Sequence, residues 1–462
     1  MSRNAIASSF RDPSGFVFNR DGVTYRQVNQ AYAQEYDHLM GSGLYQDLAD
    51  SGLLIPHQEV ALQPPSPEIA YKIIQPEPVW FVSYPYEWCF SQLKDAALSQ
   101  LRIQRRAMRF GMTLKDCTAY NTQFFCGKPV LIDTLSFERY REGEPWGAYR
   151  QFCQHFLAPL ALMAYTDVRL SQLLRIYIDG VPLDLASRLL PARTRAVPSL
   201  LFHVHLHAAS QKRHAHDPPT QSRPPARFSR QAFAGLLDSL QAAVRRLSWR
   251  PEDTAWASYY GELQDYDSAA VEHKKQVVAD FLDEVAPTTL WDLGANTGLY
   301  SRIASKRGIK TISFDADAGS IELSYLSAKK QENTHFLPLV LDLTNPTPAI
   351  GWANAERMSL LERGPADMVL VLALLHHLAI SNNVPFSWIA EFLAKTAHTL
   401  VIEYVPKTDS QAQKLLGSRQ DVFDGYDEDA FREAFSQYFA IARSVPLQHS
   451  QRVVYLMKRT SE

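Results

Sequence analysis

The sequence predicts an α/β fold built on a mostly parallel sheet that ends in an antiparallel hairpin, preceded by an α+β domain. Between residues 288 and 405, apolar strand segments alternate with helical stretches, a pattern typical of a parallel sheet covered on both faces. Residues 439–447 and 452–459 form two further strand segments across a short polar link, which indicates a hairpin. A glycine-rich turn, residues 292–298, follows the first strand of the series.

Length and composition predict two soluble domains. The chain has 462 residues, long for one compact core, and its 47 basic and 49 acidic residues give a net charge of −2. This balance does not favour nucleic acid or an anionic membrane as partner. Residues 208–230 are rich in Pro, Ser, Arg and His and predict a linker. We therefore expect an N-terminal domain at 1–207 and a C-terminal domain at 231–462, beginning with an amphipathic helix at 231–247.

The chain carries no targeting or membrane signal that we recognise, so a cytoplasmic location is expected. Its start lacks an apolar core of signal-peptide length, and the most apolar stretch, 156–165, is too short to span a bilayer. The cysteines (Cys89, Cys117, Cys126 and Cys153) are widely spaced without a CxxC pair, which is typical of reduced thiols.

The C-terminal elements follow one another as strand and helix. Strands are expected at 288–294, 310–315, 336–342, 366–374 and 398–405. Helices are expected at 299–307, 320–330 and 386–395.

The turn after the first strand has the composition of a nucleotide-binding loop. Gly294 permits a tight turn and close approach of a ligand, and Asn296 tolerates left-handed backbone geometry. Gly298 allows the following helix to pack close to the strand. The helix start then offers N–H groups and a positive dipole end to an anion.

Acidic residues follow each of the next two strands. Asp315 ends the second strand, where a carboxylate can accept hydrogen bonds from ribose hydroxyls, and Asp317 is its competitor for that role. Asp342 follows the third strand, where it and the backbone of Leu343 can meet an adenine amino group. Any one of these carboxylates could instead cap a helix. The set, in this order, predicts a nucleoside site.

The segments WDLGANTG, SFDAD, LPLVLDLTNPTPAIGW, LALLHHLAI and VIEYVPKTDSQ together resemble bacterial class I methyltransferases, some of them nodulation-protein-like. The resemblance is strong over about 250–462 and extends to the N-terminal half. It implies a Rossmann-like domain that binds S-adenosylmethionine. The turn would then hold the methionine carboxylate, and Asp292 its ammonium group.

Candidates for the chemistry lie at the end of the fourth strand. His376 or His377 could take a proton from a hydroxyl at neutral pH, or either could simply pack against the sheet. If they continue the strand, they point to opposite faces. Glu403 closes the fifth strand and could orient a histidine, bind substrate, or pair with Lys407. Asn345 and Trp352 are further candidates for the pocket wall.

The N-terminal half contains a second constellation. Lys115-Asp116, then Asn121, then Asp133 after an apolar strand, resembles the catalytic segment of aminoglycoside-kinase-like proteins, in which such residues position a hydroxyl and bind magnesium. Leu114-Lys115 stands where His-Gly is usual, no glycine-rich phosphate loop is evident, and Arg26 is a poor substitute for the nucleotide-binding lysine. A kinase-derived domain that presents substrate is favoured over an active kinase; unrelated carboxylates in a helix–hairpin segment are the alternative.

A histidine-rich stretch completes the candidates. His203, His205 and His207 alternate as on one face of a strand, and with His214 and His216 they suggest a metal site. No Cys or carboxylate accompanies them at ligand spacing, so we expect a polar strand and no metal.

The function predicted from sequence is methyl transfer from S-adenosylmethionine to oxygen or nitrogen. The resemblance to nodulation-protein-like relatives implies a sugar, glycan or other small metabolite as the acceptor. The alternatives are a bifunctional kinase–methyltransferase and a non-catalytic scaffold that binds the cofactor.

Overall fold

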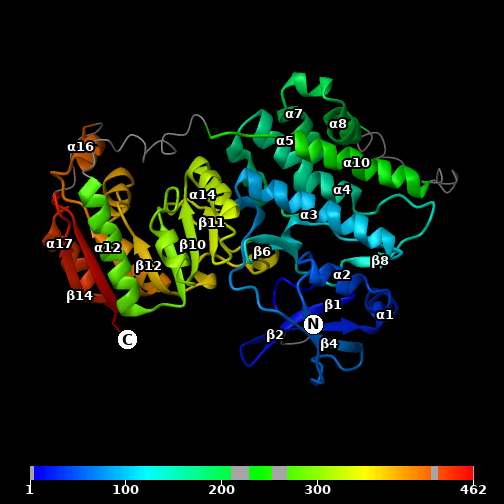
Figure 1. The fold of residues 1–462 in the computed structure, drawn as a ribbon, viewed down its shortest axis with the longest axis horizontal. Coiled ribbons are helices and arrows are strands. Elements are labelled where there is room, and N and C mark those ends of the chain that lie inside the picture. Colours follow the sequence, from blue (N-terminus) through cyan, green and yellow to red (C-terminus); the bar gives the residue numbers. More distant parts are fainter. Residues whose placement is uncertain (1–4, 210–227, 252–267, 418–424, 461–462) are drawn as a thin grey trace. The chain divides into compact units, whose positions relative to one another are not determined.

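The computed structural model describes residues 5–209, 228–251, 268–417 and 425–460 (Figure 1). The chain divides into two compact units. Unit 1 comprises residues 1–249 and 350–357, and unit 2 comprises residues 250–349 and 358–462. The chain therefore passes between the units at 249/250, 349/350 and 357/358.

Unit 2 is built on a seven-stranded sheet in the order β11-β10-β9-β12-β13-β15-β14. The first five strands are parallel, and β15 pairs antiparallel with both β13 and β14. This order confirms the predicted Rossmann-like class I methyltransferase fold. The strands are β9 (Thr289–Leu293), β10 (Lys310–Asp315), β11 (Phe336–Val340), β12 (Ala366–Val371), β13 (Ala397–Tyr404), β14 (Phe439–Pro446) and β15 (Val453–Arg459).

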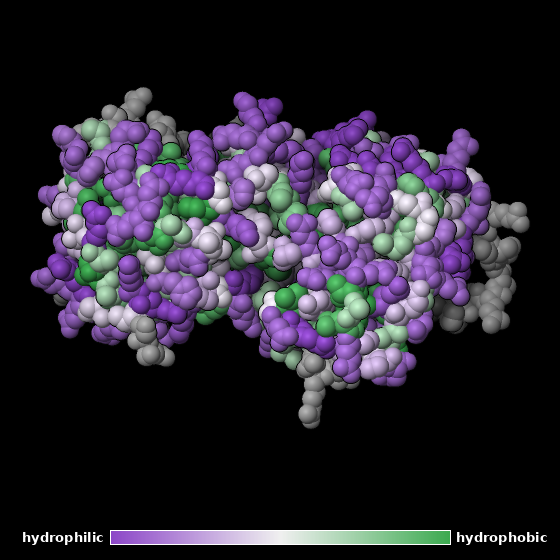
Figure 2. Space-filling model, turned by 60° about the horizontal axis from the view of Figure 1, so that its bottom comes forward, coloured by the Kyte–Doolittle hydropathy of each residue, from purple (hydrophilic) through white to green (hydrophobic). Residues whose placement is uncertain are grey.

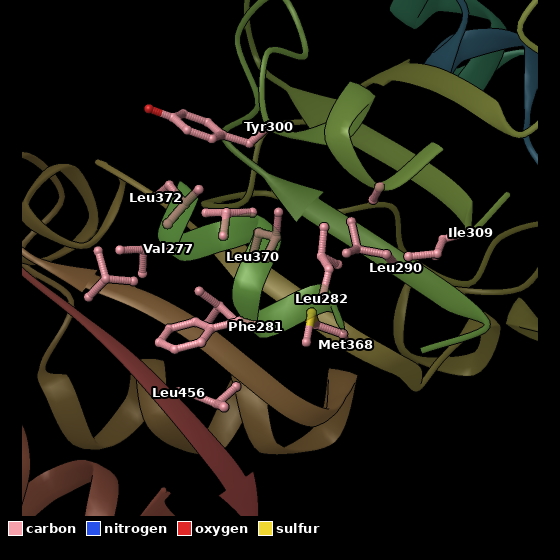
Figure 3. Packing of buried hydrophobic residues seen from close by; sticks show 14 of the residues in the cluster. Val277, Phe281, Leu282, Leu290, Tyr300, Ile309, Met368, Leu370, Leu372 and Leu456 are labelled. Carbon is pink, nitrogen blue, oxygen red and sulfur yellow. The ribbon is translucent and has the colours of Figure 1, made fainter. Parts of the chain in front are cut away.

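Helices connect these strands and pack on the sheet. They are α12 (Ser268–Val285), α13 (Ser301–Ser305), α14 (Ala318–Lys330), α15 (Phe386–Thr396), α16 (Ser410–Leu416) and α17 (Glu428–Ser436). Figure 3 shows Phe281 and Leu282 of α12 in one hydrophobic cluster with Leu370 of β12 and Leu456 of β15. This packing holds α12 on the sheet.

The strand order creates a crevice at one edge of the sheet. From β9 the chain adds β10 and β11 on one side and then returns to add β12 on the other side. Ligands bind at such a switch point, outside the carboxyl ends of the strands. The register aligns Asp292 with Ser313 of β10 and Leu370 of β12, so the turn after β9 opens into this crevice.

Unit 1 is an α+β domain, as predicted. An antiparallel sheet in the order β1-β2-β4-β3 lies at its N-terminal end and shares a small core with α1 around Tyr32 and Tyr36. Two two-stranded sheets, one of them a hairpin, and a group of helices follow. The strands are β1 (Gly15–Arg20), β2 (Val23–Asn29), β3 (His57–Glu59), β4 (Ala70–Pro76), β5 (Met112–Leu114), β6 (Thr122–Phe125), β7 (Lys128–Leu131) and β8 (Phe137–Arg139).

The described α-helices of unit 1 differ in length, and α3 is the longest of these. They are α1 (Ala33–Gly41), α2 (Leu44–Asp50), α3 (Phe90–Arg109), α4 (Tyr149–Phe152), α5 (Ala158–Tyr165), α6 (Leu173–Ile176), α7 (Leu183–Leu189), α8 (Pro198–Leu200) and α10 (Arg230–Arg246).

Helix α10 corrects the predicted domain boundary. The amphipathic helix exists as expected, but its apolar face packs in unit 1, where Phe233 contacts Tyr140 with ring centroids 5.9 Å apart. Lys94 of α3 donates hydrogen bonds to the carbonyls of Arg245 and Leu247, at 3.0 and 2.6 Å. The methyltransferase unit therefore starts at residue 250 instead of 231. Most of the predicted linker, residues 210–227, lies outside the described residues.

No helix in the described ranges is long and apolar enough to cross a bilayer. Hydrophilic side chains cover most of the face shown in Figure 2, and the hydrophobic residues form separate patches among them. The cysteines, all of which are described, form no disulfide.

Candidate functional site

A cavity of about 370 Å³ lies at the carboxyl edge of the sheet in unit 2. Its wall includes most of the residues predicted to bind a cofactor, together with residues from α12 and Arg452, which directly precedes β15. The lining residues from the predicted set are Asp292, Gly294, Asn296, Asp315, Asp317, Asp342, Leu343 and His377. Ligand cavities of proteins are of this size class.

The turn after β9 has the backbone geometry that its sequence predicts. Gly294 and Asn296 have φ values of +74° and +50°, in the left-handed region that glycine and asparagine tolerate best. Gly298 (φ +78°) does not line the cavity. A Cβ atom there would come within 2.8 Å of Phe336, which agrees with a packing role.

The N–H groups of this turn are all used within the protein. Those of Gly294 and Ala295 donate to the carbonyl of Phe314, at 2.9 and 3.0 Å. Asn296 N–H donates to Asp315, at 2.7 Å, and its side-chain oxygen accepts from Thr297 N–H, also at 2.7 Å. Gly298 N–H donates to Ala295, at 2.9 Å. Every N–H group from 294 to 298 at the predicted anion site therefore already has an acceptor. The helix that follows, α13, is short.

The two acidic residues after β10 have different partners. Asp315 accepts backbone N–H groups on both carboxylate oxygens, from Asn296 and, at 2.8 Å, from Asp317; burial nevertheless raises its pKa. Asp317 caps α14 by accepting from Gly319 N–H through Oδ1, at 2.7 Å. Its Oδ2 is buried without a hydrogen-bond partner among the described residues.

Asp292 is 2% exposed at the end of β9. Its carboxylate accepts a hydrogen bond from Ser301 Oγ at 2.5 Å. Burial raises the pKa of Asp292 to about 6, against the opposing effects of Ser301 and Lys274. The carboxylate is thus ionised at neutral pH and poorly solvated, and a cation in the cavity would stabilise it.

Lys274 and Arg452 were not predicted from the sequence, and both line the cavity. Lys274 Nζ donates to Glu403 Oε2, and Arg452 lies 3.3 Å from Glu403 Oε1. Arg452 also forms two hydrogen bonds with Asp409, at 2.7 and 2.9 Å. Lys274 could have been found, because it interrupts the apolar face of α12 between Val271 and Val278. Arg452 has no such signal.

Glu403 lies beneath the cavity and is fully buried. Its partners are Lys274, Arg452 and the N–H of Ala373, at 2.7 Å. Burial alone would raise its pKa, but the two cations hold it below the ordinary value. The predicted alternatives, an ion pair with Lys407 and direct contact with substrate, do not match this position.

The two histidines occupy different environments. Both follow β12 on a helical turn, so the prediction that they continue the strand on opposite faces is wrong; their ring centroids are 4.3 Å apart. His376 is 1% exposed, and burial lowers its pKa to about 3. His377 lines the cavity, and burial also lowers its pKa. His377 is therefore the histidine that can meet a substrate.

The loop after β11 contributes only its first residues to the cavity. Asp342 and Leu343 line it, and Asp342 Oδ1 accepts from the N–H of Thr344 at 2.8 Å. Asn345 and Trp352 are absent from the wall, and Trp352, 75% exposed, belongs to the segment Ile350–Arg357 of unit 1. The prediction for these two residues does not hold in this structure.

The kinase-like residues of unit 1 come together. Asn121 Nδ2 donates to Asp116 at 3.0 Å and lies 3.5 Å from Asp133 Oδ2. Arg26 of β2 forms an ion pair with Asp133 at 2.5 Å. Lys115 instead contacts Asp12 and Ser14, at 3.2 and 2.7 Å.

The histidine-rich stretch is helical, which corrects the predicted strand. Residues Leu201–Leu206 form a π-helix. His203 contacts Tyr149 and Ser239, both at 2.8 Å, and His205 contacts Ser187 and Thr194, at 2.8 and 3.0 Å. His214 and His216 lie outside the described residues. Within the described residues, no group of three or more His, Cys, Asp or Glu side chains could hold a metal.

Comparison with known proteins identifies the family. No family model matches the chain. A curated relative, the nodulation protein NoeA of Rhizobium meliloti (strain 1021), is 34% identical over 98% of this chain and 96% of its own length. The chain belongs to the NoeA family of nodulation proteins. The predicted resemblance to nodulation-protein-like relatives is thereby confirmed over both units.

Solved structures that are similar to part of this chain include several methyltransferases. Magnesium protoporphyrin IX methyltransferase from Synechocystis PCC 6803, with bound S-adenosylhomocysteine, is 18% identical and covers 41% of this chain and 84% of its own, with a TM-score of 0.31. A TehB-like methyltransferase from Corynebacterium glutamicum is 14% identical over 45% of this chain and 100% of its own, with a TM-score of 0.30. The bifunctional kinase–methyltransferase WbdD is 14% identical over 42% of this chain and 40% of its own, with a TM-score of 0.29.

Proposed function

We propose that this protein transfers a methyl group from S-adenosylmethionine to a hydroxyl or amine of a sugar, glycan or other small metabolite. One observation carries the proposal. The acidic residues predicted to contact the three parts of the cofactor, Asp292, Asp315 and Asp342, line a single cavity at the switch point of a class I methyltransferase sheet.

The chemistry of the cavity wall fits this cofactor. Asp292 presents a buried anion for the ammonium group, and Asp317 Oδ2 is a buried oxygen without a hydrogen-bond partner among the described residues, beside Asp315 at the proposed ribose position. Asp342 and the backbone of Leu343 would meet the adenine edge. The bound cofactor supplies an electrophilic methyl group on a sulfonium, so the protein must mainly align the acceptor with it.

His377 is our candidate for the general base. It lies at the cavity, and its lowered pKa leaves the imidazole neutral at pH 7, as accepting a proton requires. A base is needed only where the acceptor loses a proton during transfer, as a hydroxyl does. Glu403 does not line the cavity; it contacts Lys274 and Arg452, which do.

The class of acceptor rests on two arguments. The balanced charge of the chain gives no support to nucleic acid as substrate. The name of the relative connects the family with nodulation, and the resemblance found in the sequence favours a sugar or glycan.

A screen with S-adenosylmethionine carrying a deuterated methyl group tests the proposal. The purified protein would be incubated with fractionated extracts of small metabolites and glycans, and mass spectrometry would find any compound that gains the label. We expect a labelled product and stoichiometric S-adenosylhomocysteine, both lost in Asp292→Ala. Cofactor binding without any labelled product would favour the non-catalytic scaffold, and absence of binding would refute the proposal.

Unit 1 is proposed to be a kinase-derived domain without phosphotransfer activity. Arg26 neutralises Asp133, the carboxylate that would have to hold magnesium. We expect Mg·ATP to leave the thermal unfolding of the protein unchanged. Magnesium-dependent ATP binding that disappears in Asp133→Ala would instead support the bifunctional enzyme.

A further inference from the structure

Lys274 is a buried cation on the wall of the cofactor cavity. It is 5% exposed, and burial lowers its pKa even though Glu403 opposes that effect. Its neighbours along α12, including Val277, Val278 and Phe281, belong to the hydrophobic core. A lysine at such a position costs stability unless charged partners compensate it, so its presence calls for an explanation beyond helix packing.

The partners of Lys274 hold its ammonium group at the cavity. Glu403 accepts from Nζ, and Nζ also lies 4.9 Å from the ring centroid of Tyr300, which lines the cavity as well. In Figure 3 the hydroxyl of Tyr300 points away from the aliphatic cluster. An ammonium has three donors, so the bond to Glu403 leaves Lys274 able to serve a ligand.

The cavity thus presents opposite charges on neighbouring elements. Asp292 lies in the last part of β9, and Lys274 lies on α12. The two are close enough for each to influence the pKa of the other. The methionine part of S-adenosylmethionine is a zwitterion, with an ammonium and a carboxylate on one carbon. Asp292 accounts for the ammonium only.

The turn after β9 is poorly suited to bind the carboxylate through its own N–H groups. Each N–H group from Gly294 to Gly298 already donates to an acceptor within the protein. A carboxylate buried without donors or a cation would be strongly disfavoured. Lys274 is a cation on the same wall as Asp292.

We infer that Lys274 binds the carboxylate of the cofactor, and that Glu403 is a positioning residue that holds Lys274 in place. The inference rests on the proposed function, since it concerns the same cavity. It makes Lys274 and Asp292 a matched pair that selects the intact amino-acid end of the cofactor over analogues that lack one charge.

Calorimetric titration with two ligands tests the inference. One is S-adenosylhomocysteine, and the other is its decarboxylated analogue, which keeps the ammonium and the nucleoside. We expect the wild type to prefer S-adenosylhomocysteine by about 10- to 100-fold, the range of a charged hydrogen bond. Lys274→Met should lose this preference and bind both ligands equally, whereas Lys274→Arg should retain most of it.

Two further variants separate binding from stability. Lys275, next in sequence, pairs with Glu272 and does not line the cavity, so Lys275→Met should bind like the wild type. If Lys274→Met fails to fold, Lys274→Met/Glu403→Gln removes both charges of the buried pair and should likewise show no preference.

The outcomes distinguish the inference from the function on which it rests. A wild type that binds neither ligand would refute the proposed function itself. The role of Lys274 alone would be refuted if the wild type binds S-adenosylhomocysteine and a folded Lys274 variant keeps the full preference for the carboxylate. It would also be refuted if that variant binds both ligands more weakly by the same factor.

Discussion

Replacing Asp292 with Asn should stabilise the ligand-free protein while it abolishes recognition of the cofactor. Burial raises the pKa of Asp292 from about 4 to about 6, so ionisation of this carboxylate above pH 6 lowers the stability of the native state. Two pKa units correspond to about 3 kcal/mol. Asn cannot ionise and avoids this cost, and its side-chain oxygen can still accept from Ser301.

The sign of the pH dependence follows from the raised pKa. Between pH 4 and pH 6 the unfolded chain ionises Asp292 while the native protein keeps it protonated, so wild-type stability falls as pH rises. Relative to Asp292→Asn, the wild type should be less stable by about 1.5 kcal/mol at pH 5 and by about 3 kcal/mol at pH 8. Below pH 4 the two proteins should converge.

Thermal unfolding of both proteins at pH 5 and pH 8 measures this difference. At pH 8 we expect the variant to melt about 6–12 °C higher, given roughly 2–4 °C per kcal/mol for a domain of this size. Saturating S-adenosylhomocysteine should raise the melting temperature of the wild type only. A variant that is less stable at pH 8, shows no change in the difference with pH, or responds equally to the ligand would refute the reasoning.

Three other substitutions test separate parts of the structure. His377→Ala should lower kcat by about 10²- to 10⁴-fold on a hydroxyl acceptor. Because burial lowers the pKa of His377, wild-type activity should fall only below the ordinary histidine pKa of about 6.5. An unchanged kcat would show that His377 is not the base. Gly298→Ala should destabilise unit 2 more than Gly308→Ala. Both glycines have positive φ, but only at Gly298 would the added Cβ atom clash, with Phe336 at 2.8 Å. Equal melting temperatures of the two variants would contradict this. Arg11→Ala should lower the free energy of unfolding, measured with denaturant, by about 1–2 kcal/mol. The substitution removes two hydrogen bonds from the buried Glu356, and the half-exposed arginine limits the size of the effect. An unchanged free energy of unfolding would show that the pair is not stabilising.

The residues that line the cavity from the turn after β9 and the end of β10 could be predicted because they are local in sequence. Gly294, Asn296 and Asp315 follow directly after apolar strands, and the carboxyl ends of parallel strands meet at one edge whatever the details of packing. Lys274 and Arg452 could not be assigned in this way. Their roles depend on a fully buried partner, Glu403, that is distant in the chain from Lys274, and sequence periodicity does not reveal which elements face each other.

Two errors have a similar physical origin. The alternation His203, His205, His207 resembles that of a strand, but Leu201–Leu206 is a π-helix. Within it, His203 and His205 form hydrogen bonds with hydroxyl groups of other helices. Helix α10 was recognised from its apolar stripe, yet the stripe shows only that one face is buried. Which unit supplies the covering surface is a tertiary property.

Equilibrium dialysis with radiolabelled S-adenosylmethionine tests the central claim most directly. We predict saturable retention of one label per chain, displaced by excess S-adenosylhomocysteine and lost in Asp292→Ala. A folded wild-type protein that retains no label would contradict the account, as would retention that Asp292→Ala leaves unchanged.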